Sequence, residues 1–266
     1  MEYENRYIAF IDILGFRSLL KERTAEELYD IINKFQTQSF KAKQNKINKE
    51  EDFKLDFQVT CFSDNVVISC LNKKDEKNST SLIHFLEEIV NYQLILNIYK
   101  ITIRAGITKG ELVHQDDICY GPGLVRAYYL ESEIAIFPKI VIDNNIVYEL
   151  NLANQTEKDI YLQLSQGENL FHFIDTFKTY NDWLNEVEEM SQSKQNESKR
   201  YILGIKLQLK NLREVIVEGL KNENADVQLK YRWMQKKYNN CITPHLLKSN
   251  KLILEKDFID IYKPIF

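Results

Sequence analysis

Residues 7–16 read YIAFIDILGF, and this segment decides the fold. Its residues are apolar, β-branched or aromatic up to Gly15, a pattern that predicts a buried strand from Arg6 to Ile13. The segment carries one carboxylate, Asp12. A buried charge is very costly unless it is paired. The fold must therefore supply Asp12 with a partner.

A second segment, residues 59–68 (VTCFSDNVVI), repeats this pattern around Asp64. We predict a hairpin of strands 55–62 and 65–71, with Ser63 and Asp64 at the turn. Carboxylates that converge from two strands indicate a shared Mg²⁺ or Mn²⁺ site and phosphoryl chemistry, with the Ile13 carbonyl as a third ligand. The alternative is that Asp12 caps a turn and Asp64 is an ordinary hairpin residue, since Ser-Asp-Asn suits turns.

Composition narrows the class of protein. The chain has 266 residues, of which 44% are hydrophobic and 28% charged, as in soluble globular proteins. Its net charge of −4 argues against a nucleic-acid scaffold, which needs a basic face. The four cysteines form no CxxC pair, so a zinc ribbon is not expected. We see no leader peptide and no apolar run of the ~18 residues that a membrane helix needs, and expect a cytoplasmic protein without membrane contact.

The remaining segments predict an α+β architecture. A capping box at Thr24 opens a helix, and a second helix covers residues 81–99. Strands follow at 101–107, after a break at 110–113, and at 140–142, and Gly121-Pro122-Gly123 opens a helix that reaches about residue 133. We expect a mostly antiparallel sheet with helices covering one face. Beyond residue 146 the chain becomes mainly helical, so we divide it into 1–146 and 147–266, an extension packed on the core.

Further residues are candidates for binding an anionic substrate. Arg104 lies in the middle of a predicted strand and needs an anionic partner such as a triphosphate, unless it lies at an edge and faces water. Gly15 could expose amides to a phosphate, although a lone glycine more often only makes a turn. Phe16 could line a pocket for a base or ribose, or it could belong to the core. Arg126 could offset the negative charge of the departing diphosphate, or it could be a solvated residue of the helix. We interpret the four histidines as structural or surface residues.

These residues resemble a known family. Residues 10–16 (FIDILGF), 62–64 (FSD), 104–111 (RAGITKGE) and 121–123 (GPG) are similar to the class III nucleotide cyclase homology domain, over about residues 5–145. Residues 120–131 and 137–140, with 230–233 (KYRW) and 238–239, resemble more closely the Pycsar pyrimidine cyclases of bacterial anti-phage defence.

The resemblance implies a ferredoxin-like cyclase core and a homodimer with active sites at the interface. It implies two Mn²⁺ or Mg²⁺ ions held by Asp12, the Ile13 carbonyl and Asp64, and a triphosphate clamped by Arg104. Gly15 and Phe16 would then contact substrate. Gln58 matches the strand position where purine cyclases carry a base-reading Lys, and its amide offers both a donor and an acceptor.

Two departures from the purine cyclases bear on the substrate. Ile118 occupies the region where an adenine-reading Asp would lie, although Asp116 and Asp117 are close. Val125 and Tyr129 stand where purine cyclases carry Asn and Arg, so Arg126 or Lys139 would have to supply positive charge. We therefore expect a uridylate cyclase that makes cyclic UMP from UTP, whose product activates a separate effector. The alternatives are a cytidylate cyclase acting on CTP, a purine cyclase or other metal-dependent nucleotidyl enzyme, an inactive nucleotide-binding module, and a dimeric interaction domain.

Overall fold

The computed structural model describes residues 2–37, 56–72, 80–152, 164–166, 171–190, 196–249 and 260–266. It comprises two compact units. The first consists of Met1–Gln93 and Thr102–Ile174, and the second of Leu94–Ile101 and Asp175–Phe266. The division at residue 146 into two domains stays a prediction. Parts of that prediction beyond residue 152, such as residues 153–163, lie outside the described residues.

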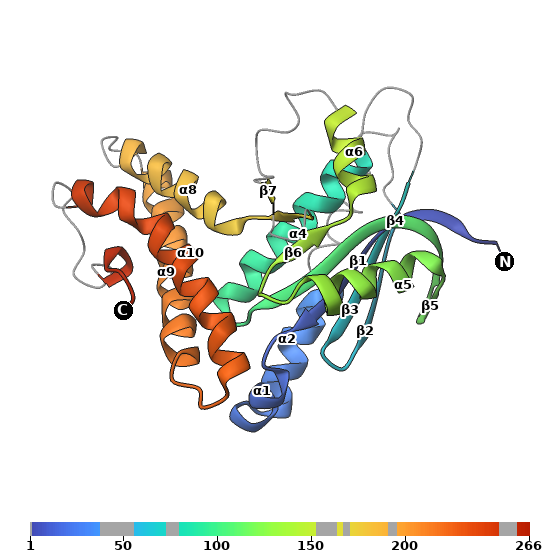
Figure 1. Ribbon diagram of the computed structural model, residues 1–266, viewed down its shortest axis with the longest axis horizontal. Helices are drawn as coiled ribbons and strands as arrows, with labels where there is room; N and C mark the ends of the chain where they lie inside the picture. The colour runs from blue at the N-terminus through green and yellow to red at the C-terminus, as the bar shows by residue number, and fades with distance from the viewer. Residues whose placement is uncertain are drawn as a thin grey trace. The chain divides into compact units, whose positions relative to one another are not determined.

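The first unit is built on one sheet with the strand order β2-β3-β1-β4-β6-β8-β7, and β5 pairs with β4 (Figure 1). All pairs are antiparallel except the parallel pair of β4 and β6. The predicted α+β fold with a mostly antiparallel sheet is therefore confirmed. The strands are β1 Glu4–Ile13, β2 Phe57–Phe62, β3 Asn65–Leu71, β4 Ile103–Gln115, β5 Ile118–Tyr120, β6 Ile140–Ile142, β7 Leu164–Gln166 and β8 His172–Ile174.

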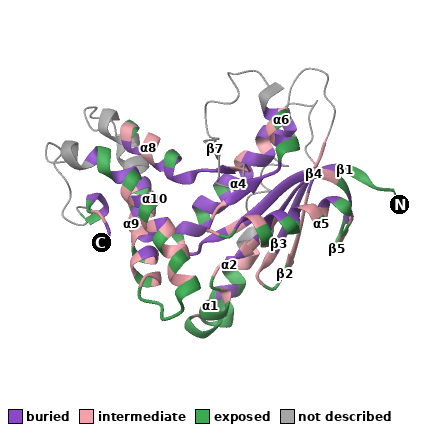
Figure 2. Ribbon diagram, viewed as in Figure 1, coloured by how far each residue is buried: buried purple, intermediate pink, exposed green. Residues whose placement is uncertain are grey.

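Side chains of β1 alternate between the two faces of the sheet, as the pleat requires. Tyr7 stacks on Phe85 of helix α4 (Thr80–Ile98), with ring centroids 6.0 Å apart. Ile8 points to the opposite face and meets Gly123 of helix α5 (Pro122–Tyr129). The prediction that helices cover one face is wrong, because α5 packs on the other. Figure 2 shows that buried residues follow these central strands.

A local signal in the sequence accounts for the start of helix α2. The predicted capping box opens α2 (Ala25–Thr37): Glu27 accepts a hydrogen bond from the Thr24 backbone at 2.9 Å, and Thr24 Oγ1 accepts one from the Glu27 backbone at 3.2 Å. The predicted break before residue 110 is wrong, since Gly110 keeps its place in β4 opposite Arg6. The other helices are α1 Phe16–Glu22, the π-helix η1 Leu130–Ile134 and α6 Asn144–Leu152.

The second unit is mainly helical, as the sequence predicts. It contains α8 (Thr176–Met190), α9 (Asn196–Gly219) and α10 (Ala225–Ser249), which pack on one another. Tyr180 lies in its core and accepts a hydrogen bond from Asn97 at 2.8 Å. Across the part of the chain that the structure describes, no helix has the length and apolar character needed to cross a membrane.

Candidate functional site

Asp12 and Asp64 lie at the same end of the sheet. Asp12 is the next-to-last residue of β1 and stands opposite Asn65, the first residue of β3. The Ile13 backbone N–H donates to the Asp64 carbonyl at 2.9 Å, which ties the end of β1 to the β2–β3 turn. Asn65 donates to Asp64 Oδ1 at 3.2 Å. The predicted turn at Ser63 and Asp64 is confirmed, and it holds both carboxylate-bearing residues beside each other.

Arg104 meets two carboxylates on the face of the sheet where α5 packs. It stands opposite Asp12 in the β1–β4 ladder, and its Nε–H donates to Asp12 Oδ2 at 2.9 Å. The same Nε lies 2.6 Å from Oε1 of Glu131. Because the Nε–H bond is directed at Asp12, the contact with Glu131 is an ion pair rather than a hydrogen bond. Arg104 therefore does not lie at an edge of the sheet facing water. Asp12 and Glu131 already serve as its anionic partners.

Glu131 is the site residue that sequence reasoning missed. Its side chain is only 3% exposed, against 22% for Arg104 and 15% for Asp12. It belongs to the π-helix η1, a local widening often found at functional sites. A buried glutamate needs a cation. The only local signal for its burial was the preceding Leu130, since Tyr128 and Tyr129 before it are exposed.

Gly106 allows Glu131 to reach Arg104. A Cβ on Gly106 would lie 2.3 Å from the Ala127 carbonyl oxygen and 2.7 Å from the Glu131 nitrogen. Helix α5 and η1 therefore lie against the backbone of β4 itself. Since Gly106 is two residues beyond Arg104 on the same face, this close approach brings the buried carboxylate to the guanidinium.

The residues that follow β1 lead away from the sheet. Gly15 has φ +74°, which an L side chain rarely adopts, and it precedes α1. No neighbour lies within 4 Å of a Cβ built there. The conformation alone thus accounts for the glycine, and its role toward a phosphate stays a prediction. Phe16 is half-buried at the start of α1, and its contact with substrate stays a prediction too.

The two carboxylates fit a divalent cation that is completed by other ligands. Among the described residues, Asp12 Oδ1 and Asp64 Oδ2 have no protein partner. Oxygen is the donor that Mg²⁺ and Mn²⁺ prefer, and Mg²⁺ commonly uses one or two carboxylates plus substrate phosphates. No group of three or more His, Cys, Asp and Glu is gathered for a metal within the described ranges. The chain thus offers two carboxylates, and further ligands must come from backbone, water or substrate.

Gln58 lies on the same face of the sheet, away from these carboxylates. It pairs with Ser69, whereas Asp12 pairs with Asn65, four residues along β3. At about 3.3 Å per strand residue, the separation along the sheet is about 13 Å. Gln58 Nε2 donates to Asp56 Oδ1 at 3.2 Å.

Arg126 and Lys139 are both engaged by other residues. Arg126 donates two hydrogen bonds of 2.8 Å to the two carboxylate oxygens of Asp143, which also accepts from Thr108. Although burial raises the pKa of Asp143, the hydrogen bonds from Arg126 and Thr108 outweigh it and lower that pKa. Lys139 lies over the Phe137 and Phe173 rings. Arg126 therefore holds helix α5 to the residue after β6, which argues against its expected part in offsetting charge.

Comparisons with known proteins give remote structural likenesses. The chain matches no protein-family model and no curated protein sequence. It is similar to the adenylyl cyclase CyaB from P. aeruginosa (16% identity, 65% of this chain, 94% of that one, TM-score 0.43). It is also similar to an adenylate/guanylate cyclase/hydrolase from Silicibacter pomeroyi (14%, 65% and 98%, TM-score 0.40). Both TM-scores are below 0.5.

Proposed function

We propose that this protein is a nucleotide cyclase that converts UTP to 3′,5′-cyclic UMP and diphosphate with two divalent metal ions. The observation that carries the proposal is the hydrogen bond from Ile13 N–H to the Asp64 carbonyl, which joins two carboxylate-bearing strand ends beside the partly buried Arg104. The N–H and C=O of a strand residue point toward the same neighbour, so the Ile13 carbonyl is a suitable third ligand.

The residues of this chain would act by positioning and by charge. Bound Mn²⁺ or Mg²⁺ would supply Lewis acidity at the ribose 3′-oxygen and at the phosphates. Asp12 and Asp64 would hold the ions at the end of the sheet where the 3′-oxygen would attack the α-phosphorus. Arg104 would leave Asp12 and grip the triphosphate with the outer nitrogens of its planar guanidinium, while Glu131 stays paired with Nε. Such reactions need little covalent chemistry from the protein.

A second copy of the chain would complete the site. Gln58 and Asp12 are about 13 Å apart along the strand direction alone, which is longer than the single ribose that joins a base to its α-phosphate. Val125, Tyr128 and Tyr129 lie on one side of α5 and are 69%, 53% and 44% exposed, and Phe62 at the β2–β3 turn is 79% exposed. Exposed apolar patches of this kind mark protein interfaces. We propose that a homodimer covers them and sets Gln58 of one copy against the carboxylates of the other.

The test is incubation of the purified protein with each of ATP, GTP, CTP and UTP plus Mn²⁺, with products identified by mass. We expect cyclic UMP from the wild type and from Asp30→Asn, an exposed control, and none from Asp64→Asn. Conversion of CTP alone would indicate the cytidylate cyclase, and conversion of ATP or GTP a purine cyclase. Binding of a nucleotide without turnover would indicate the regulatory module. Loss of all turnover and binding would reject the proposal. The role of the product in activating an anti-phage effector rests on the family resemblance.

A further inference from the structure

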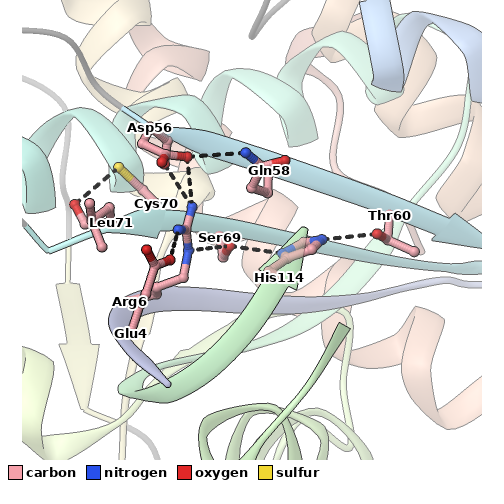
Figure 3. A network of polar contacts seen from close by, with 9 residues as sticks. All are labelled: Glu4, Arg6, Asp56, Gln58, Thr60, Ser69, Cys70, Leu71 and His114. Carbon is pink, nitrogen blue, oxygen red and sulfur yellow. Dashed lines mark hydrogen bonds and ion pairs between the residues drawn. The ribbon is translucent and has the colours of Figure 1, made fainter. Parts of the chain in front are cut away.

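Arg6 is a buried cation outside the proposed metal site. It is 1% exposed and lies on β1, on the same face of the sheet as Gln58 and Ser69. Its guanidinium contacts Glu4 at 2.6 Å and Asp56 at 2.9 Å, and its Nε–H donates to Ser69 Oγ at 2.9 Å. Figure 3 shows that two arms of hydrogen bonds extend from it to strand β2.

The first arm fixes the amide of Gln58. Asp56 is held by Arg6 through both its side chain and its backbone carbonyl, each at 2.9 Å. A carboxylate only accepts hydrogen bonds, so the Gln58 group that meets Asp56 Oδ1 at 3.2 Å must be the NH₂. The amide oxygen then lies on the side away from Asp56 (Figure 3). Gln58 keeps one N–H and the oxygen for another partner.

The second arm fixes the hydroxyl of Thr60. Ser69 Oγ accepts from Arg6 and lies 2.8 Å from His114 Nδ1, while His114 Nε2 lies 2.9 Å from Thr60 Oγ1. Within the described residues Ser69 has no other partner, so its buried hydroxyl hydrogen is satisfied only by donating to Nδ1. Burial and the charge of Arg6 lower the pKa of His114 to about 4, which keeps the ring neutral. Its one hydrogen must then be on Nε2 and point at Thr60.

Thr60 Oγ1 therefore accepts a hydrogen bond from His114 Nε2–H. The hydroxyl hydrogen of Thr60 is then available to donate to a bound ligand. Gln58 and Thr60 are two residues apart on one face of β2, and both are half-buried. We propose that Arg6, acting through these two arms, makes the row Gln58 Nε2–H, Gln58 Oε1 and Thr60 Oγ1–H a donor–acceptor–donor site for the uracil edge. This inference rests on the proposed cyclase function and names the residues that choose its base.

Uracil is the base whose edge complements this row. Its O2, N3–H and O4 present acceptor, donor and acceptor. Cytosine presents acceptor, acceptor and donor, so two of the three pairs would set like groups against each other. Guanine presents acceptor, donor and donor, and would fail at the last position. A site with fixed hydrogen-bond directions rejects the wrong base because its polar groups are left unpaired.

Which atoms donate in the hydrogen bonds from Ser69 through His114 to Thr60 can be measured without enzymatic turnover. In protein labelled with ¹⁵N-histidine, the His114 signals can be assigned by their loss in His114→Gln. We expect the Nε2–H tautomer at neutral pH, with Nδ1 unprotonated. The Nδ1–H tautomer would overturn the inference, because Thr60 would then donate into the sheet rather than outward.

The base preference is tested by kcat/KM for UTP and CTP with Mn²⁺. We expect the wild type to favour UTP by at least about tenfold, a typical value for matched hydrogen-bond pairs. Thr60→Val keeps the shape and removes the hydroxyl, and should lower the UTP/CTP ratio about tenfold through loss on UTP. Ser69→Ala leaves Thr60 in place but breaks the arm, and should lower the ratio as well. A wild type without preference for UTP would overturn the inference.

Matched controls separate positioning from stability. Thr60→Ser keeps the donor and should hold the ratio within about threefold of the wild type. Cys70→Ala removes a buried side chain beside Ser69 that faces the opposite side of the sheet. It should lower the melting temperature and leave the ratio unchanged; an equal fall in ratio would overturn the role of Ser69. If no nucleotide is turned over, the cyclase proposal fails. Equilibrium binding of UTP and CTP then decides the inference, and equal affinities would reject it.

Discussion

Nε of Arg104 lies 2.6 Å from Oε1 of Glu131 and donates to Asp12 Oδ2 at 2.9 Å, so one guanidinium is shared by two carboxylates. Asp12 is also the proposed metal ligand. Arg104 and a divalent ion would therefore compete for the same carboxylate, and Glu131 would keep Arg104 paired after the ion displaces it. The ion pair and the proposed metal site are thus parts of one arrangement.

Glu131→Gln should destabilise the fold and weaken the metal response. It removes one of two anions from a partly buried arginine, at a cost of about 1–3 kcal/mol in the free energy of unfolding. With Asp12 as its only strong anion, Arg104 should hold that carboxylate more firmly, so the Mn²⁺ concentration for half-maximal turnover should rise. Glu133→Gln changes an exposed residue of the same π-helix and serves as the control. Equal urea denaturation curves for the two variants would contradict this assignment.

Gly106→Ala tests the close approach that brings Glu131 to Arg104. The added methyl would lie 2.3 Å from the Ala127 carbonyl oxygen and 2.6 Å from Leu130 Cβ, so α5 and η1 must move from β4. Overpacking of this kind typically costs about 1–3 kcal/mol. Gly204→Ala in α9 meets nothing within 4 Å and should stabilise the chain, since alanine favours helices. Thermal melts of both variants give the comparison, and a neutral Gly106→Ala would refute the packing argument.

Arg126→Gln should affect stability more than catalysis. The variant leaves Asp143, whose side chain is 10% exposed, without its bidentate partner, at a cost of about 1–3 kcal/mol. We expect kcat to stay within about threefold of the wild type. A group that offsets transition-state charge in phosphoryl transfer contributes roughly a thousandfold or more. A loss of that size in kcat, measured at saturating UTP, would show that Arg126 leaves Asp143 during the reaction.

Local patterns predicted the central strands and the longer helices, whereas the short strands β5, β7 and β8, the helix α6 and contacts between distant residues escaped them. The strand around Asp12 and the turn at Asp64 follow from apolar runs and turn-forming residues, and both were predicted. The pairing of Arg104 with Glu131 joins residues on β4 and η1 and depends on a missing Cβ at Gly106, which no short pattern encodes. His114 gave no signal either, because its partners Ser69 and Thr60 lie on other strands.

The stability of the chain should fall as the pH drops from 7.5 to 5, because His114 must stay neutral when folded. Burial, followed by the charge of Arg6, lowers its pKa from 6.5 to about 4, and the opposing effect of Asp56 is smaller. Because the pKa of His114 is lower in the folded than in the unfolded chain, its contribution to the free energy of unfolding is complete above pH 6.5. This contribution is lost toward pH 4, because in that range only the unfolded chain takes up the proton. The loss between pH 7.5 and 5 is roughly 2 kcal/mol.

Urea denaturation of the wild type and His114→Gln at several pH values within this range measures how much His114 contributes to the pH dependence of the unfolding free energy. Glutamine offers one donor and one acceptor without a titrating ring, so it should remove most of the pH dependence that His114 causes while keeping both neighbours paired. The difference in unfolding free energy between the two proteins should then shrink by roughly 2 kcal/mol from pH 7.5 to 5. A difference that stays constant would mean that folded His114 takes up its proton over the same pH range as the unfolded chain. His114 would then not be confined between Arg6, Ser69 and Thr60 as the hydrogen bonds indicate, and the polarity assigned to Thr60 would lose its basis.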